Sequence, residues 1–417
     1  GTTGPPKAVM LSHENLAWTA ATAIQMVKIG PGDCSLSYLP LSHIAEQMFS
    51  IHLPLSSGVP IWFAEDLTRL KDCLVVARPT LFLGVPRVWE KFRNALEAKL
   101  AEATGLKEKI VSLSRDALLE AGHIEILHGA DALSPVLKAK YALANKLFAS
   151  KLKAALGLDR LRVAVTGAAP ISYDVLEFFL SIGIIIHEVY GQSEDNGPTT
   201  FNFPLPGKRK LGSAGMAFPG VEVRIADDGE VLVRGPNVFM GYYRDEDATA
   251  ETLVDGWLHS GDIGRFDEDG FLYITDRKKD LIITAGGKNV APQNIEKLIR
   301  QIEGVGNAVV IGDRRKFLTA LVTVDPDQGP ALAARRGWPS DPAALATHHA
   351  FREHVEASLE RDVNAELARY ETVKKFAILP DDFTVEGGEL TPTQKVKRRV
   401  VHAKYGDVIE AFYDGLD

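Results

Sequence analysis

The feature that most constrains the fold of this chain is a strand–helix–strand pattern between residues 162 and 189. Two runs rich in β-branched residues, Arg162–Val165 and Ile184–Val189, flank a helical stretch at Ser172–Leu180. Strands joined by a helix pair in parallel, because the helix returns the chain to the edge where the first strand began. We therefore predict an α/β fold with a parallel sheet. Further strands are expected at Cys34–Leu39, Val59–Phe63 and Thr80–Leu83.

The texture of the sequence changes along the chain and predicts two domains. Leu, Ala, Lys and Glu at helical spacing indicate a helical insertion at about residues 87–153. Short strands with Asp-Gly turns indicate a β-rich subdomain at about residues 207–276. The charged segment Asp276–Asp280 then precedes a new alternation of strands and helices. We expect a large domain over residues 1–278 and a small α+β domain over residues 279–417.

Composition excludes several classes of protein. The net charge of -8 argues against a dedicated nucleic-acid binder, because such a protein needs basic residues to neutralise phosphates. Two cysteines, Cys34 and Cys73, suit a reducing compartment and supply neither a disulfide framework nor a Cys-rich metal site. We expect a cytoplasmic globular protein. Because the chain starts at Gly1 with no initiator Met, its beginning looks cut.

The opening segment Gly1–Lys7 combines two glycines, two hydroxyls and one cation. Glycines let backbone N–H groups approach an anion closely, and lysine supplies charge, so the segment suits a polyphosphate. It differs from the P-loop of NTPases, because Ala8 stands where a Ser or Thr would bind magnesium. Taken alone, the segment fits a simple Gly/Pro-rich turn better. The predicted phosphate contacts are Thr2, Thr3, Gly4 and Lys7.

Two further segments follow predicted parallel strands, at the strand ends where ligands of such sheets gather. In Tyr190–Glu194, Tyr190 could stack on a flat base and Glu194 could hold Mg²⁺. In Gly167–Pro170, small residues leave room for a ligand ring. The alternative for both is an ordinary surface turn. The predicted ligand contacts here are Gly167, Ala168, Ala169, Pro170, Tyr190, Gly191 and Ser193.

Two charged residues complete the candidate set. Asp262, in Ser260-Gly261-Asp262, could accept hydrogen bonds from two ribose hydroxyls, although Asp also begins many turns. Lys395 follows a loop with two glycines, and a mobile lysine is a good point charge for a reacting phosphate. The alternative for the basic run Lys395–Arg399 is a solvated face.

Together and in this order, these segments resemble the adenylate-forming superfamily of acyl-CoA synthetases, firefly luciferase and adenylation domains of peptide synthetases. Tyr38–His43 resembles the motif whose His lies near the carboxylate substrate. The resemblance implies that Lys395, Glu194 and His43 are catalytic, with Glu194 as the magnesium ligand. It also implies three assignments that the residues alone do not give. These are a ribose contact for Arg277, a hinge at Lys279 and a pantetheine route along Gly286 and Gly287.

Within the superfamily, three segments resemble the long-chain fatty acyl-CoA synthetases. They are Gly84–Trp89 before the helical insertion, the linker Asp276–Thr284 and the terminal motif Leu390–Arg398. Ser193 stands where Thr is commoner and keeps the hydroxyl. The resemblance also implies that the N-terminal part of the large domain, which the family packs beside these regions, is missing from this sequence.

The resemblance implies an enzyme that activates a long-chain fatty acid with ATP and Mg²⁺. The acyl-adenylate then forms a thioester with coenzyme A, releasing AMP in addition to pyrophosphate, while the small domain swings about Lys279. Three alternatives stay open: a fatty acyl-AMP ligase, another acid–CoA ligase, and a nucleotide-binding fragment without turnover. Peripheral contact with a membrane and a homodimer also stay open, but the sequence shows no distinct amphipathic helix.

Overall fold

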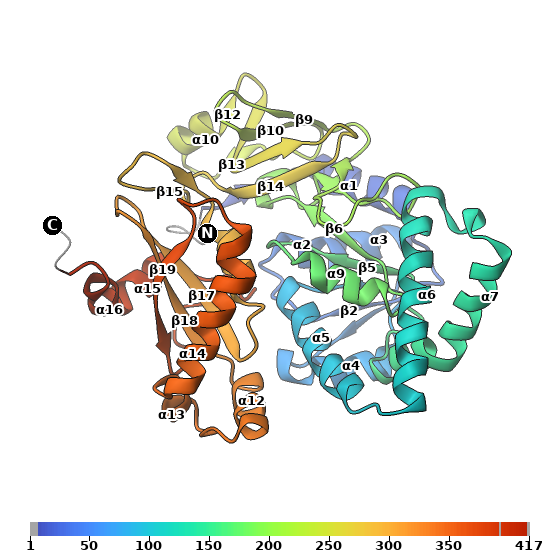
Figure 1. Cartoon of the computed structure of the whole chain (residues 1–417). Coiled ribbons are helices and arrows are strands. Elements are labelled where there is room, and N and C mark those ends of the chain that lie inside the picture. The colour runs from blue at the N-terminus through green and yellow to red at the C-terminus, as the bar shows by residue number, and fades with distance from the viewer. Residues whose placement is uncertain (1–6, 392, 415–417) are drawn as a thin grey trace. The chain divides into compact units, whose positions relative to one another are not determined.

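The structure is a computed structural model that describes residues 7–391 and 393–414 (Figure 1). Thr2, Thr3 and Gly4 of the predicted phosphate loop therefore lie outside the described residues. The chain forms two compact units. The larger unit holds Lys7–Ser260 and Gly264–Ile274, and the smaller unit holds Gly261–Ile263 and the residues from Thr275 onward.

The larger unit is built on a mixed seven-stranded sheet, in the order β3-β2-β4-β5-β6-β7-β8. Neighbours among the first five strands pair in parallel, whereas β6 pairs antiparallel with β7, and β7 with β8. The predicted parallel sheet is thus confirmed. The strands are β2 (Ser35–Ser37), β3 (Ile61–Phe63), β4 (Leu81–Leu83), β5 (Val163–Thr166), β6 (Ile186–Tyr190), β7 (Thr200–Phe201) and β8 (Met216–Ala217).

Two groups of helices accompany this sheet. The first group is α1 (His13–Val27), α2 (Ile44–Gln47), η1 (Met48–His52), α3 (Leu53–Ser57), η2 (Leu67–Arg69) and α4 (Leu70–Ala77). Helix α1 begins at a capping box, in which the Asn15 N–H donates to Ser12 Oγ at 3.0 Å and the Ser12 N–H donates to Asn15 Oδ1 at 2.8 Å. The second group consists of α9 (Tyr173–Leu180) and the helices between Pro86 and Ala155, in the segment where the sequence predicts a helical insertion.

In this insertion, two helical arms pack side by side (Figure 1). Its elements are α5 (Pro86–Ala101), α6 (Leu106–His128), η3 (Ala130–Ala132), α7 (Pro135–Ala144), η4 (Asn145–Ala149) and α8 (Ser150–Ala155). The first arm is α6, and the second is the continuous run of α7, η4 and α8. Trp89 of α5 anchors the insertion, because the indole is fully buried with ring centroids 5.5 Å from Phe82 of β4 and 5.0 Å from Phe179 of α9.

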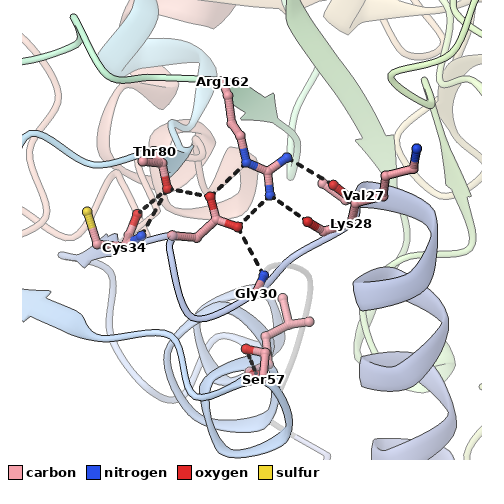
Figure 2. A network of polar contacts seen from close by, with 9 residues as sticks. Val27, Lys28, Gly30, Cys34, Ser57, Thr80 and Arg162 are labelled. Atoms are coloured by element: carbon pink, nitrogen blue, oxygen red, sulfur yellow. Dashed lines mark hydrogen bonds and ion pairs between the residues drawn. The ribbon is translucent and has the colours of Figure 1, made fainter.

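A polar network joins the N-terminal ends of β4 and β5 to the loop that follows α1 (Figure 2). Arg162 Nε donates to Asp33 Oδ1 at 2.7 Å, and Thr80 Oγ1 donates to the same oxygen at 2.8 Å. The Arg162 guanidinium also donates to the carbonyls of Val27 and Lys28. Burial alone would raise the pKa of Asp33, but its hydrogen bonds, those from Arg162 first, hold that pKa below its ordinary value.

The predicted β-rich subdomain is also present. Strands β9 (Glu222–Ile225) and β10 (Glu230–Arg234) form an antiparallel hairpin, whose turn places Gly229 at a φ of 86°. Tight hairpin turns need such a positive φ, which glycine adopts readily, and this is why the Asp-Gly pair predicts a turn here. The other elements of this part are β11 (Gly241–Tyr242), α10 (Glu246–Thr252), β12 (Leu253–Val254), β13 (Trp257–Phe266) and β14 (Leu272–Arg277). Strand β1 (Val9–Met10), from the start of the chain, pairs with β11 in a separate two-stranded sheet.

The smaller unit contains a three-stranded sheet in the order β17-β18-β19, with helices packed against it. Every residue of β17 and β18 is buried, in accordance with their mostly apolar sequences. The three strands of this sheet are β17 (Val305–Ile311), β18 (Leu318–Val324) and β19 (Val373–Leu379). A separate hairpin pairs β15 (Ile282–Ile283) with β16 (Asn289–Val290). The helices are α11 (Pro292–Ile299), α12 (Gln328–Arg336), α13 (Pro342–Ala346), α14 (His349–Ser358), η6 (Leu359–Val363), η7 (Asn364–Glu366), α15 (Arg398–Lys404) and α16 (Gly406–Ala411). Among the described residues, no helix is both long enough and apolar enough to cross a membrane.

Candidate active site

In the larger unit, the end of the predicted phosphate loop lies beside the predicted magnesium ligand. Strand β1 pairs with β11, with Val9 opposite Tyr242. As a result, Lys7 Nζ lies 4.6 Å from the centroid of the Tyr242 ring. The Tyr242 hydroxyl donates a hydrogen bond of 2.7 Å to Glu194 Oε1. One cation and one carboxylate are thereby grouped around a single tyrosine.

Tyr242 is a residue that the sequence did not point to. The only local signal is an aromatic pair, Tyr242-Tyr243, in a strand of the β-rich subdomain. Its partner Glu194 is 48 residues away in the sequence. The β1–β11 pairing that brings Lys7 to Tyr242 joins segments that are still farther apart in the sequence. Burial, and after it the hydrogen bond with Glu194, raises the pKa of the Tyr242 hydroxyl. The hydroxyl therefore keeps its proton and donates a hydrogen bond to Glu194.

The segment after β6 folds back tightly and presents Glu194 on a short helix, η5 (Ser193–Asp195). The Thr199 N–H donates to the Tyr190 carbonyl at 2.8 Å, and the Gly197 N–H donates to the Gln192 carbonyl at 2.9 Å. A Cβ atom on Gly191 would lie 1.4 Å from the Gly197 carbonyl oxygen, so no other residue type fits this turn.

Gly167–Pro170 follows β5 directly beside β6. A Cβ atom on Gly167 would lie 2.6 Å from Val189 Cγ1 and 2.9 Å from the Val189 carbonyl oxygen. Ala168 adopts a left-handed φ of 71°, which costs energy for a residue with a side chain. The structure therefore brings Gly167–Pro170 and Tyr190–Glu194 together at the carboxyl ends of adjacent strands, where the sequence predicted a ligand pocket.

His43 lies at the start of α2, where its Nδ1 accepts a hydrogen bond of 3.1 Å from the Ala45 N–H. This contact requires the proton of the neutral ring to be on Nε2. The next residue, Ile44, lies beside the turn that follows η5, since a Cβ atom on Gly197 would be 4.0 Å from Ile44 Cγ1. The half-buried imidazole therefore begins a helix that borders the Tyr190–Glu194 segment.

The smaller unit holds a second group of predicted residues. Asp262 on β13 is 5% exposed, and Arg277 at the end of β14 places its Nε 3.2 Å from Asp262 Oδ1. Burial and the positive Arg277 lower the pKa of the Lys395 ammonium to about 8, while Asp262 and Asp280 act in the opposite direction. These electrostatic effects join Asp262, Arg277 and Lys395 in one charged group.

Hydrogen bonds to Thr391 position the loop that carries Lys395. The Thr391 N–H donates to the Lys395 carbonyl at 2.8 Å, and the Lys395 N–H donates to Thr391 Oγ1 at 3.0 Å. These bonds close a turn at the Leu390–Val396 bridge. Threonine, rather than glycine, thus sets the position of the lysine.

The alternative of a solvated basic face is wrong for part of the run Lys395–Arg399. The Arg398 side chain is 19% exposed and pairs at 2.6 Å with Glu296, whose side chain is 6% exposed. Arg399, in contrast, is exposed. Arg398 therefore forms a structural ion pair with Glu296 within the smaller unit, and Lys395 belongs to the charged group around Asp262.

The other predicted residues of the smaller unit are exposed. Lys279 lies in a turn that is closed by a hydrogen bond of 2.9 Å from the Asp280 N–H to the Arg277 carbonyl. Gly286 and Gly287 form the tip of the β15–β16 hairpin, where the Gly287 N–H donates to the Thr284 carbonyl at 2.8 Å. The roles of Lys279 as a hinge and of this tip as a coenzyme A contact stay predictions.

Glu194 is compatible with magnesium. In the described part of the chain, no group of three or more His, Cys, Asp or Glu side chains is placed to hold a metal ion. Mg²⁺ bound to a nucleotide does not need such a group, because phosphates and waters supply most of its ligands and one carboxylate is often enough. Glu194, beside the cation of Lys7, fits a Mg²⁺–polyphosphate better than a bare metal ion.

Comparison with known proteins assigns the family. The sequence matches the AMP-binding enzyme family over residues 1–243 and the AMP-binding enzyme C-terminal domain over residues 279–417. It is 41% identical over 453 residues to the long-chain-fatty-acid–CoA ligase ACSBG2 of Xenopus laevis, covering 99% of this chain and 59% of that protein. It is 39% identical over 421 residues to the long-chain-fatty-acid–CoA ligase FadD15 of Mycobacterium tuberculosis (strain ATCC 25618 / H37Rv), covering 99% of this chain and 68% of that protein.

Solved structures agree with this fold. The ATP-bound crystal structure of MatB from Rhodopseudomonas palustris matches 98% of this chain and 67% of that chain, with a TM-score of 0.66 and 25% identity. The A domain of carboxylic acid reductase from Segniliparus rugosus, in complex with AMP and a co-purified carboxylic acid, matches 99% of this chain and 60% of that chain. Its TM-score is 0.71 at 24% identity, so it supports the fold alone. The chain belongs to the AMP-binding enzyme family, in the branch of the long-chain fatty acyl-CoA synthetases.

Proposed function

We propose that the chain activates a long-chain fatty acid with ATP and transfers the acyl group to coenzyme A. The observation that carries this proposal is the group of Lys395 with the Asp262–Arg277 pair, because it joins a cation suited to a reacting phosphate to a carboxylate suited to ribose. The names of relatives at about 40% identity, over 99% of this chain, favour the fatty acid as the acid and coenzyme A as the acceptor.

The chemistry explains why two steps are needed. A carboxylate does not acylate a thiol at neutral pH, because an oxide is a poor leaving group. In the first step a carboxylate oxygen attacks the α-phosphorus of ATP, the bond to pyrophosphate breaks, and an acyl-adenylate forms. In the second step the sulfur of coenzyme A attacks the carbonyl carbon and loses its proton, while AMP leaves. Catalysis then consists mainly of alignment and neutralisation of charge.

The residues of this chain fit the first step. Lys7 and Lys395 would spread the negative charge that develops on the phosphates, and Asp262 would accept hydrogen bonds from the ribose hydroxyls, with Arg277 beside it. Magnesium, when bound with the nucleotide, would neutralise phosphate oxygens, and Glu194, oriented by Tyr242, would hold it.

The remaining roles rest on the family resemblance and on the local geometry. Tyr190 and Gly167–Pro170 would receive the adenine ring, and His43 would lie near the carboxylate of the fatty acid. Gly286 and Gly287 would contact coenzyme A in the second step, and Lys279 would be the hinge. We further propose that the enzyme works in the cytoplasm.

The test is pyrophosphate release and acyl-CoA formation with free acids from acetate to oleate, each with and without coenzyme A. We expect turnover to rise with chain length and to require coenzyme A after the first equivalent. Glu194→Gln should lose most of this activity, whereas Glu251→Gln, which neutralises an exposed carboxylate of α10, should not.

Three outcomes would contradict the proposal. Pyrophosphate release that stops after one equivalent, even with coenzyme A, would indicate transfer to another acceptor. Turnover that is highest with acetate would exclude the long-chain substrate. ATP binding with no pyrophosphate release from any acid would indicate a nucleotide-binding protein without turnover.

A further inference from the structure

The second arm of the helical insertion exposes an apolar stripe. The elements α7, η4 and α8 follow one another without interruption over residues 135–155. Val136 is 66% exposed, Leu143 is 58% exposed and Leu147 is 45% exposed. Residues spaced by seven and by four lie on the same side of a helix, so these three side chains form a single outward stripe.

The same helix has a second apolar side, which fixes it to the rest of the larger unit. Leu137, Ala144 and Phe148 are 5%, 4% and 8% exposed, and the arm packs against α6 (Figure 1). Because apolar residues occupy both sides, the sequence shows no clean amphipathic period. Only the packing reveals which leucines face outward, and this is why the sequence did not mark the helix as amphipathic.

Lysines surround the outward stripe. Residues 132–158 contain five lysines and neither Asp nor Glu, in a chain whose net charge is -8. Lys140, Lys146 and Lys151 are exposed, and each is three or four residues from a member of the stripe. Lys153, in contrast, turns inward, since its Nζ donates to the Gly183 carbonyl at 3.5 Å and burial lowers its pKa.

We propose that this surface, the insertion face, binds an anionic lipid bilayer. We define the face by Val136, Lys140, Leu143, Lys146, Leu147 and Lys151. Its apolar stripe would enter the boundary between headgroups and acyl chains, while the flanking ammonium groups would extend to lipid phosphates and carboxylates. Each lysine near an anionic surface favours binding, and its contribution weakens as salt increases.

Charge favours a bilayer over a contact between two copies of this face. Such a contact would remove three ammonium groups of each copy from water, and no carboxylate within residues 132–158 could pair with them. At a bilayer, the ammonium groups stay hydrated among anionic headgroups. The proposal does not depend on the ligase activity, because the binding can be measured without ATP.

The experiment is flotation of the full chain with two kinds of phosphatidylcholine vesicles. One kind contains about 30% phosphatidylserine, which is on the order of the anionic fraction of a typical anionic leaflet, and the other contains none. Two variants test the face: Lys140→Glu/Lys146→Glu/Lys151→Glu and Leu143→Ser/Leu147→Ser. The matched control, Lys71→Glu/Lys91→Glu/Lys99→Glu, makes the same change of charge at three exposed lysines elsewhere. Thermal melting of each variant reports whether it is folded.

We expect the unmodified chain to bind anionic vesicles and to be released by high salt. The lysine variant should bind roughly 100-fold more weakly, because three favourable charges are reversed, and the matched control should keep most of the binding. The leucine variant should weaken binding while the release by salt remains.

No binding to anionic vesicles, or equal losses in the lysine variant and its matched control, would overturn the proposal. A concentration-dependent dimer that the leucine variant abolishes, in a chain that ignores vesicles, would instead identify the face as a contact between copies.

Discussion

At the scale of single residues, the ionisation of Lys395 has a direct consequence for the pH dependence of the proposed first step. Burial and Arg277 lower its pKa to about 8, so the cation loses its proton as the pH rises through 8. An ordinary lysine would stay charged up to about pH 10. Because kcat/KM reports ionisations of the free enzyme, we expect kcat/KM for ATP to fall above pH 8.

The measurement is the pH profile of pyrophosphate release between pH 6 and pH 10. In Lys395→Arg, the residual activity should no longer decline near pH 8, because a guanidinium does not deprotonate in this range. An unchanged decline in this variant would assign the ionisation to another group.

Tyr242 supports a second prediction at this scale. Tyr242→Phe removes the hydroxyl that donates to Glu194 Oε1 but keeps the ring beside Lys7. A carboxylate that loses an orienting partner binds metal about 10- to 100-fold more weakly, so the magnesium concentration needed for half-maximal activity should rise by about this factor. Tyr243→Phe is the control, because Tyr243 is 55% exposed. Equal magnesium requirements in the two variants would remove the role of Tyr242.

At the scale of elements, the turn after β6 depends on the absence of a side chain at residue 191. Gly191→Ala would place a methyl group 1.4 Å from the Gly197 carbonyl oxygen, so the turn must open. We expect a loss of more than about 2 kcal/mol in the free energy of unfolding, together with loss of ATP binding. Gly32→Ala, which meets nothing within 4 Å, should change stability by less than about 0.5 kcal/mol. Urea denaturation of both variants measures the difference, and similar stabilities would contradict the geometry.

The Asp33–Arg162 pair holds three elements together and supports a further prediction (Figure 2). Arg162→Leu leaves the buried Asp33 carboxylate without its cation, which should cost about 2–4 kcal/mol of unfolding free energy. Arg160→Leu, at an exposed neighbour, should be nearly neutral. Adding Asp33→Asn to Arg162→Leu should restore part of the loss, since the uncompensated charge is removed. A double variant no more stable than Arg162→Leu would show that charge is not the cause.

The same elements show what a sequence can and cannot predict. The strands β5 and β6 and the helix α9 between them follow from local apolar runs, and the ends of β5 and β6 locate Gly167–Pro170 and Tyr190–Glu194 without knowledge of the fold. Tyr242, which orients Glu194, could not be found, because a strand pairing between residues 9 and 242 places it there. The turn at Thr391 was missed because its hydrogen bonds involve a side chain whose direction the sequence does not give.

At the scale of the whole molecule, the chain consists of two compact units, each with its own group of candidate residues. Lys7, Tyr242 and Glu194 belong to the larger unit, whereas Asp262 and Lys395 belong to the smaller unit. The central claim of the proposed function is that Lys395 serves formation of the adenylate and is not needed for its transfer to coenzyme A. This claim separates the chain from an enzyme in which one fixed set of residues performs both steps.

The measurement that tests this claim most directly compares the two half-reactions in Lys395→Ala. The first is formation of oleoyl-adenylate from oleate and ATP, and the second is formation of oleoyl-CoA from pre-made oleoyl-adenylate. Arg399→Ala is the control, because it removes an exposed cation from the same basic run. We expect Lys395→Ala to lose the first half-reaction by at least ~100-fold and to keep the second, and Arg399→Ala to keep both. Parallel losses of both half-reactions in Lys395→Ala would contradict the account.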